Sequence, residues 1–480
     1  MEKEKQVGLT AKKEENFSEW YTQVIQKADL IEYTLVSGCY VFKPNSYSIW
    51  EKVQNYLNKH FKELGVKNAY FPLFIPESVL KKEASHIEGF NPEVAWVTQA
   101  GNTKLSEKLA IRPTSESIMY DAYSKWIRSY RDLPLKLNQW ANIVRWEFKT
   151  PLPFLRSREF LWQEGHTVYA TKEEADKEVK QILDLYEKVY EELFAIPVLK
   201  GQKTEKEKFA GALYTTSIEV FLPNGKAIQA ATSHALGQNF AKAFNIEFLD
   251  KNSKKQFAWQ NSWGLTTRSL GILTIMHSDN KGFVMPPKVA HTQVVIIPIL
   301  FDKEKEKIIK QCEKIKKDLS NFSVELDLRE SYSPGWKFNE HELKGIPLRI
   351  ELGPKDLEKN QAVLVRRDTG EKIIVKLKDV KKKAENLLDD IQNNLLNKAK
   401  DFMEKNTVET SNLNDLEKAL NNKKLAKAFW CENQECENKI RQKIETSKIL
   451  NVPFDQPKSM KNCLICNKKA QKLVYIAKSY

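Results

Sequence analysis

Four of the six cysteines lie near the end of the chain, and their spacing is typical of a metal site. Cys431 and Cys436 have four residues between them, Cys463 and Cys466 have two, and twenty-six residues separate the pairs. Zinc prefers four tetrahedral ligands, and two cysteine pairs can each bind it from a turn. Four buried thiols without a metal are the alternative, but the paired spacing favours zinc. Because cysteine fills all four positions, no place is left for a catalytic water, and the expected zinc is structural.

A second group of residues suits phosphate chemistry. Residues 135–170 alternate apolar and charged positions around a polar turn, which predicts two antiparallel strands joined by a long loop. Arg145 and Glu147 precede the loop, and Arg156 and Phe160 follow it. Two arginines on adjoining strands can bind a triphosphate through bidentate contacts, and Phe160 offers adenine a stacking surface. A surface hairpin with alternating charges explains the spacing equally well.

Three further short motifs are Arg112–Glu116, Gln229–His234 and Gly264–Gly271. The first two place small hydroxyls beside an ionisable group, as a pocket for a polar small molecule would. Either could instead be a capped turn, since Thr114 is a suitable N-cap for a helix over Ser115–Trp126. In the third motif, flanking glycines would let Arg268 approach a phosphate closely, although this spacing is a weak signal alone.

The elements that must position these residues are predicted from hydrophobic periodicity, capping residues and turns. Helices are expected around residues 17–25 and over Ser46–Leu64, Thr171–Leu193, Asp302–Leu319, Lys337–Lys344 and Lys381–Glu404. Strands are expected over Asn68–Ile75, Tyr214–Leu222, Lys226–Ala231, His291–Leu300, Ser323–Leu328, Pro347–Leu352, Gln361–Arg367 and Glu371–Lys376. Pro72 within the first of these strands suits an edge or interface position, and Pro76 ends the strand.

Length and charge limit the class of protein. The 480 residues suggest about three domains at roughly 150 residues each. The longest nearly apolar run, Val294–Phe301, is too short for a membrane span, and the charged start lacks the apolar core of a signal peptide, so a soluble, intracellular protein is expected. The net charge of +14 favours nucleic acid as a partner. A lysine-rich surface that only confers solubility is the alternative.

Taken together, the motifs resemble those of class II aminoacyl-tRNA synthetases, and most of all those of prolyl-tRNA synthetases of the archaeal and eukaryotic type. Asn68–Pro76 is similar to motif 1 of the class, the arginine hairpin to motif 2, and Gly264–Gly271 to motif 3. Arg112–Glu116 resembles the proline-binding loop of the family, and Tyr332–Gly353 resembles its anticodon-binding domain. The four-cysteine tail and the terminal Tyr480 match the same subtype.

The resemblance implies a mixed α/β (α+β) fold. An antiparallel-sheet catalytic domain would cover residues 1–285, an α/β anticodon-binding domain 286–380, and a small zinc-binding α+β domain 381–480. It implies attachment of L-proline to tRNA(Pro) through prolyl-adenylate, with ATP, Mg²⁺ and structural Zn²⁺, in a cytoplasmic homodimer built partly on Asn68–Pro76. The expected helix and strands fill the interval from Glu164 to Gly264, so no editing domain is expected.

The resemblance also assigns roles to single residues. Those expected around proline are Thr114, Glu116, Arg145, His234, Phe90 and Trp162. Those expected around ATP are Arg145, Glu147, Arg156, Phe160, Gln229, Thr232, Thr266 and Arg268. Arg145 and Arg268 would be catalytic, because carboxylate attack on the α-phosphate builds negative charge that guanidinium groups stabilise. Gln229 would contact Mg²⁺, and Glu342 and Arg349 would contact anticodon bases.

Three other interpretations remain open at this point. A class II synthetase for threonine, glycine, histidine or serine would share most of these motifs. A catalytically silent RNA-binding relative would lose its phosphate contacts, and the presence of Arg145, Arg156 and Arg268 counts against it. A simple nucleic-acid-binding module would leave residues 40–285 unexplained.

Overall fold

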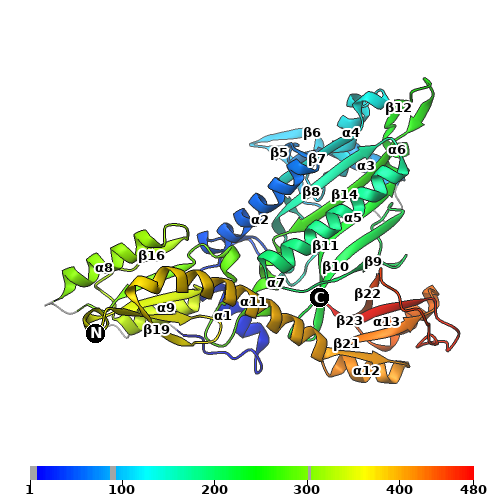
Figure 1. Ribbon diagram of the computed structural model, residues 1–480. Helices are drawn as coiled ribbons and strands as arrows, with labels where there is room; N and C mark the ends of the chain where they lie inside the picture. The colour runs from blue at the N-terminus through cyan, green and yellow to red at the C-terminus, as the bar shows by residue number, and fades with distance from the viewer. Residues whose placement is uncertain (1–7, 87–92, 301–303) are drawn as a thin grey trace.

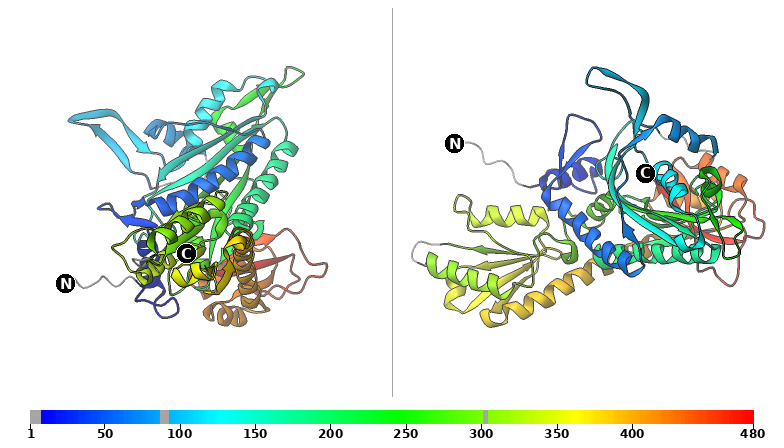
Figure 2. Two further views of the ribbon diagram at one scale, coloured as in Figure 1. Left: turned by 60° about the vertical axis from the view of Figure 1, so that its left-hand side comes forward. Right: turned by 90° about the horizontal axis from the view of Figure 1, so that it is seen from above.

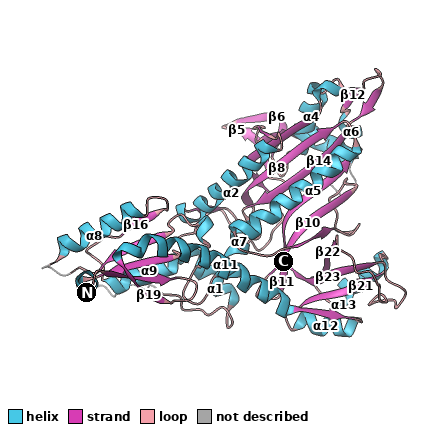
Figure 3. Ribbon diagram, viewed as in Figure 1, coloured by secondary structure: helices cyan, strands magenta, loops and turns pink. Residues whose placement is uncertain are grey.

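The computed structural model describes residues 8–86, 93–300 and 304–480, and it mixes helices with sheets (Figures 1 and 3). Its largest element is a sheet of eleven described strands in the order β20-β21-β23-β22-β9-β10-β11-β14-β8-β7-β3. The antiparallel middle of this sheet consists of β10 (Tyr214–Phe221), β11 (Lys226–Gly237), β14 (Trp259–Thr266), β8 (Glu159–Tyr169) and β7 (Leu135–Val144). The expected antiparallel sheet of the catalytic domain is confirmed.

Strands β7 and β8 form the predicted hairpin. They pair along their whole length, from Leu135 opposite Val168 to Val144 opposite Glu159. Strand β11 is longer than predicted and continues past Ala231, because the added residues pair with β14. This extension places residue His234 inside the sheet.

Four helices pack against the sheet around one large core that buries Trp50 and Trp263. They are α1 (Phe17–Lys27), α2 (Pro44–Glu63), α5 (Lys172–Lys188) and α7 (Arg268–His277). Helix α5 begins as predicted, because the Thr171 side chain accepts a hydrogen bond from the Glu174 N–H. Its last predicted turn, Val189–Leu193, is a π-helical turn.

The predicted cap of the helix after the Arg112–Glu116 motif is wrong. Helix α4 covers Glu116–Trp126, and its N-cap residue is Ser115, which makes no side-chain cap bond. The Thr114 hydroxyl donates to the Glu116 carboxylate, and the Ser115 hydroxyl donates to Glu164. Buried carboxylates need hydrogen-bond donors, so both hydroxyls serve them instead of the helix end.

Asn68–Ile75 is not one continuous strand, contrary to the prediction. Strand β3 (Lys67–Asn68) pairs with β7 at the edge of the large sheet. Strand β4 (Phe74–Pro76) belongs to a separate small sheet with β6 (Thr103–Ile111) and β5 (Trp96–Ala100). Proline has no N–H for a strand ladder, and Pro72 lies in the gap between β3 and β4. The predicted edge position is confirmed for β3.

Residues 294–376 form the predicted alternation of strands and helices. The described sheet has the order β16-β15-β17-β18-β19. Its strands are β15 (Val294–Pro298), β16 (Val324–Leu326), β17 (Leu348–Leu352), β18 (Gln361–Arg366) and β19 (Lys372–Lys376). Its helices are α8 (Lys305–Asp318), α9 (Pro334–Lys344), α10 (Pro354–Glu358) and the first part of α11 (Val380–Asn406). The predicted helix start at Asp302 lies outside the described residues.

Helix α11 runs from the five-stranded sheet to the cysteine-bearing tail (Figure 2). The tail consists of β20 (Thr407–Thr410), α12 (Leu413–Asn421), β21 (Leu425–Trp430), α13 (Gln434–Lys443), β22 (Ser447–Pro453) and β23 (Lys472–Ser479). Strand β22 pairs with β9 (Leu199–Gln202), so the tail continues the large sheet. Glycine is required at Gly201, because a Cβ there would lie 2.3 Å from the Val452 carbonyl oxygen. The domain limits at 285 and 380 remain predictions.

Candidate active site

A cavity of about 300 Å³ brings together most of the residues that were predicted to bind proline and ATP. The predicted residues that line it are Thr114, Glu116, Arg145, Phe160, Trp162, Gln229, Thr232, His234, Thr266 and Arg268. Of the others, Glu147 is exposed and does not line it, and Arg156 lines an adjoining hollow. Phe90 lies outside the described residues.

Alternate residues of β8 face this cavity. Phe160, Trp162, Glu164 and His166 all line it, as the two-residue period of a strand requires. Glu164 and His166 were not among the predicted site residues. The alternation itself was the signal that could have identified them, because it continues from Phe160 and Trp162.

One end of the cavity holds a buried carboxylate that already has a donor. The Glu116 side chain is buried and accepts a hydrogen bond from the Thr114 hydroxyl. Arg145 also lines this cavity. Its Nε donates to the Pro113 carbonyl over 2.9 Å, and its guanidinium carbon lies 5.6 Å from the centre of the Trp162 ring. The backbone and an aromatic face therefore fix the orientation of Arg145.

A buried network supports this end of the cavity. Glu164 Oε1 accepts hydrogen bonds from Gln139 Nε2, at 2.8 Å, and from the Ser115 hydroxyl. Glu164 Oε2 lies 3.0 Å from His166 Nε2, and His166 Nδ1 lies 3.0 Å from the Tyr120 hydroxyl. Burial opposes a charged His166, but the bond to Glu164 and the nearby carboxylates raise its pKa above the usual value. The network balances buried negative charge with its own donors.

His234 is held neutral beside these carboxylates. Burial, together with the charges of His166 and Lys203, lowers the pKa of His234 to about 3. Its Nδ1 lies 2.9 Å from the Thr215 hydroxyl, and the centre of its ring lies 4.8 Å from that of Phe209. A neutral imidazole can hydrogen-bond a ligand without adding positive charge, so this end suits a small cation that Glu116 attracts.

The other end of the cavity is positively charged. Arg268 donates from Nη1 to the Gln229 carbonyl over 3.2 Å and from Nε to the Leu155 carbonyl over 3.3 Å. Burial and the like charges of Arg145 and Arg156 lower the pKa of Arg268. A buried guanidinium group with two like charges near it indicates a site for a polyanion, and arginine favours phosphate oxygens.

The predicted anticodon contacts lie in the five-stranded unit, where both already have partners. Glu342 in α9 forms an ion pair of 3.1 Å with Lys281. Arg349 in β17 pairs with Glu351 at 2.8 Å, and its guanidinium carbon lies 4.4 Å from the centre of the Phe338 ring. Contact with an RNA base by either side chain would have to replace or extend these interactions.

The structure brings the four tail cysteines together. Their sulfur atoms lie within 4.8 Å of one another, and the Cys431 sulfur is 3.6 Å from that of Cys436 and 3.7 Å from that of Cys466. Sulfurs bound to one tetrahedral zinc at about 2.3 Å are about 3.8 Å apart. A hydrogen bond from the Lys468 backbone lowers the pKa of Cys466 to about 7, which favours its thiolate form. Ligand type and spacing therefore fit zinc.

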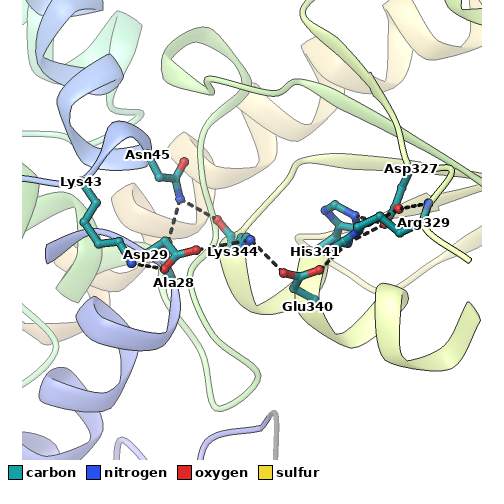
Figure 4. Close-up of polar contacts among 9 residues, drawn as sticks. All are labelled: Ala28, Asp29, Lys43, Asn45, Asp327, Arg329, Glu340, His341 and Lys344. Atoms are coloured by element: carbon teal, nitrogen blue, oxygen red, sulfur yellow. Dashed lines mark hydrogen bonds and ion pairs between the residues drawn. The ribbon is translucent and has the colours of Figure 1, made fainter. Parts of the chain in front are cut away.

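A second cluster of possible metal ligands, Asp327, Glu340 and His341, is filled by an arginine (Figure 4). Arg329 Nη2 lies 2.6 Å from Asp327 Oδ2 and 2.5 Å from Glu340 Oε2. His341 Nε2 lies 2.9 Å from Asp327 Oδ2. Despite burial, the bonds from Arg329 and His341 hold the pKa of Asp327 well below its usual range. The guanidinium group occupies the place that a cation would take.

The same cluster connects the five-stranded unit to the N-terminal helices (Figure 4). Lys344 forms ion pairs with Glu340 at 2.9 Å and with Asp29 at 3.3 Å. Asp29 in turn pairs with Lys43 at 2.5 Å. These contacts orient α9 against α1 and α2, and they were not predicted from the sequence.

Three family models match successive parts of the chain. The class II tRNA synthetase core domain (G, H, P, S and T) matches residues 96–277, and the anticodon binding domain matches 293–387. The model of the prolyl-tRNA synthetase C-terminal domain matches 413–480. Fold and cavity thus define a class II aminoacyl-tRNA synthetase with an anticodon-binding domain.

Relatives that align with nearly the whole chain identify the family within this class. A proline–tRNA ligase of Natranaerobius thermophilus is 50% identical over 470 residues, which cover 97% of each chain. The cytoplasmic proline–tRNA ligase of Arabidopsis thaliana is 51% identical over 100% of this chain and 92% of its own length. A bifunctional glutamate/proline–tRNA ligase of Mus musculus is 51% identical over 98% of this chain, which spans only 33% of that relative. The chain belongs to the prolyl-tRNA synthetase family, which confirms the resemblance in the motifs.

Proposed function

We propose that this chain attaches L-proline to tRNA(Pro) in two steps, through a prolyl-adenylate. The observation that carries this proposal is the polarity of the cavity. Strand pairing orders the lining: His166 and His234 both lie opposite Ser262, and Trp162 lies opposite Thr266, two residues before Arg268. The charge of buried Glu116 acts on His166. The Arg145 guanidinium lies near the Phe160 and Trp162 rings, toward Arg268. An amino acid with its ammonium at Glu116 would direct its carboxylate toward the arginines, where the α-phosphate of ATP would be bound.

In the first step, a proline carboxylate oxygen forms a bond to the α-phosphorus, and the bond from that phosphorus to the α,β-bridging oxygen breaks. Pyrophosphate leaves with the bonding electrons. Negative charge develops on the phosphoryl oxygens, and Arg145 and Arg268 would stabilise it without any protein nucleophile. Gln229 and Thr232 line the cavity with the oxygen ligands that Mg²⁺ prefers, and Mg²⁺ bound there would neutralise phosphate charge.

Selectivity for proline is supported by the shape and charge of the Glu116 end. A secondary ammonium needs acceptors in a small dry pocket, which Glu116 and the neutral His234 provide. The Trp162 ring offers an apolar face for the pyrrolidine ring. Phe160, on the same strand, would stack on adenine. Glu147 is exposed and does not line this cavity, so the lining does not support its proposed contact with ATP.

The second step would transfer the prolyl group to the 3′ end of tRNA, with release of AMP. The match to an anticodon-binding domain and the net charge of +14 support an RNA partner. Glu342 and Arg349 are proposed to contact anticodon bases, and the pair Glu342–Lys281 would then rearrange on binding. We further propose that the interval from Glu164 to Gly264 holds no editing domain, since α5 and β9 to β11 fill it.

We propose a structural zinc at Cys431, Cys436, Cys463 and Cys466. Cys436 and Cys463 are buried in the hydrophobic core of the tail, so the metal would add its binding free energy to the stability of that core. Elemental analysis should find about one zinc per chain. A chain purified without chelators that contains no zinc would contradict this part of the proposal.

A homodimer is proposed on the surface around the N-terminal hairpin. The strands β1 (Ile31–Tyr33) and β2 (Tyr40–Phe42) expose Leu35 and Val36 between them, and Tyr70 and Phe74 are exposed in the segment similar to motif 1. Exposed apolar groups of this size favour an interface. Light scattering should give twice the chain mass at micromolar concentration.

A cytoplasmic location is also proposed, in line with the relative from Arabidopsis thaliana that is named as cytoplasmic. Among the described helices, none has the length and apolar composition that crossing a membrane requires.

The deciding experiment is ATP–pyrophosphate exchange with a panel of amino acids. Proline should stimulate exchange strongly, and alanine weakly, because losing two methylene contacts costs only a few kcal/mol of discrimination. Exchange stimulated by threonine, glycine, histidine or serine, and not by proline, would overturn the assignment. No exchange with any amino acid would support a silent RNA-binding relative instead.

A further inference from the structure

An open hollow of about 410 Å³ adjoins the active cavity. Arg156 lines it from the catalytic side, and Arg441 in α13, Lys448 in β22 and Tyr480 line it from the tail. The Glu207 side chain lines both the hollow and the active cavity, so the two spaces meet there. The hollow thus begins beside Arg156, one of the residues expected around ATP, and the tail forms its opposite wall.

Basic groups dominate this hollow. Among the described residues that line it, Glu207 is the one with a carboxylate side chain, and it pairs with both Arg441 and Lys448, the latter at 3.6 Å. The buried Nε–H of Arg441 has no acceptor among the described residues. Burial and the charge of Lys203 lower the pKa of Lys448. One carboxylate shared by two cations leaves donors for an added anion.

A further cation, Lys226, lies near Arg156 and Tyr480. Its Nζ lies 4.8 Å from the centre of the Tyr480 ring. Burial and the charge of Arg156 lower the pKa of Lys226. Three cations, Arg156, Arg441 and Lys448, therefore line one space, and Lys226 lies beside it at the Tyr480 ring. A compact polyanion would relieve their mutual repulsion.

We propose that this hollow binds inorganic pyrophosphate as it leaves the α-phosphate, and that Arg441 and Lys448 are the tail residues that hold it. The proposal rests on the proposed function, and it takes Arg156, which is expected to bind ATP, as the contact of the two phosphates that leave as pyrophosphate. A guanidinium and an ammonium match a small anion with several terminal oxygens. The cysteine-bearing tail would then take part in the adenylation half-reaction as well as stabilise the fold.

Exchange kinetics of the full chain test this inference. Pyrophosphate is varied at saturating ATP and proline for Arg441→Gln, Lys448→Gln and the double variant. Lys443→Gln is the matched control, because Lys443 lies on the same helix and pairs with Glu417 away from the hollow. The double variant should raise the KM for pyrophosphate about tenfold, while the KM for ATP and for proline and all values of the control change less than about twofold.

A variant that should lower the KM for pyrophosphate distinguishes a binding role of the two cations from a purely structural one. Glu207→Gln should free both cations and lower the KM for pyrophosphate, and Arg441→Lys should keep it within about threefold of the wild type. If the double variant has a much lower Tm than the wild type, the KM values of the single variants and of Glu207→Gln test the inference.

An unchanged KM for pyrophosphate in the folded variants would overturn the inference. A raised KM for tRNA in aminoacylation, with the KM for pyrophosphate unchanged, would also overturn it and assign the cations to RNA phosphates. Absence of proline-dependent exchange in the wild type would instead refute the proposed function.

Discussion

The two ends of the active cavity differ in how their charges are balanced. At the Glu116 end, carboxylates already have donors inside the protein: Thr114 donates to Glu116, and Ser115, Gln139 and His166 contact Glu164. At the arginine end, the Arg268 guanidinium donates to two carbonyl groups among the described hydrogen bonds, and burial together with nearby guanidinium groups lowers its pKa. The carboxylates of the first end therefore have hydrogen-bond donors before the substrate binds, whereas the second end has an excess of positive charge.

Because of this difference, substitutions at one end should mainly lower stability, and substitutions at the other end should mainly lower the rate of adenylation. Removing a charge from the balanced end leaves a buried partner without its counter-charge, which costs folding free energy. Removing a charge from the arginine end relieves repulsion in the free protein and costs transition-state stabilisation instead. Four predictions test this contrast, from the largest expected effect to the smallest.

Arg145→Ala should lower the rate of adenylation roughly 100- to 1,000-fold, or about 3–4 kcal/mol, because a charge contact to the reacting phosphate is lost. The free energy of unfolding should fall by no more than about 1 kcal/mol, since the hydrogen bond lost is the one from Nε to the neutral Pro113 carbonyl and no buried charge is left unpaired. Single-turnover adenylation and urea unfolding measure the two quantities. A loss of rate under about fivefold would show that Arg145 does not contact the reacting phosphate.

Glu164→Gln should have the opposite profile. His166 would lose its carboxylate partner, and the donors Ser115 and Gln139 would lose a charged acceptor, so the free energy of unfolding should fall by about 2–3 kcal/mol. The KM for proline should rise more than the KM for ATP. Unchanged stability in urea would mean that the network is not balanced as described.

His234 should make stability depend on pH. Its folded pKa of about 3 lies below the unfolded value near 6.5, so the unfolded chain binds a proton first as the pH falls. Stability is unaffected by this group above pH 6.5 and should decrease by about 1–2 kcal/mol between pH 7 and pH 5. His234→Asn should remove this part of the slope. Parallel pH profiles for both proteins would contradict the low pKa.

Thr114→Val should produce the smallest change. The methyl group replaces the hydroxyl that donates to Glu116, at a cost of about 1 kcal/mol, which corresponds to about a fivefold higher KM for proline. The KM for ATP should not change, because Thr114 lies at the other end of the cavity. An equal rise in both constants would show that the two ends are not independent.

Short-range patterns explain how much of the fold and site the sequence could predict. The β7–β8 hairpin, the start of α5 and the alternation of strands and helices beyond Val294 follow from local periodicity and caps, and all are observed. Two local errors concern Thr114 and the strand over Asn68–Ile75. Both arose where a partner distant in sequence, a buried carboxylate or a second sheet, competed with the local preference.

By itself, the sequence determined the ligand types and the motifs: four paired cysteines, the arginine hairpin and Arg268. Tertiary structure alone decided that β22 extends the catalytic sheet, that Glu164 and His166 join a network with Ser115 and Tyr120, and that Arg441 and Lys448 line one hollow with Arg156. Periodicity reports which face of an element a side chain lies on, because that face depends on neighbouring residues. It carries no information on which distant element packs opposite, because that choice depends on the packing of the whole core.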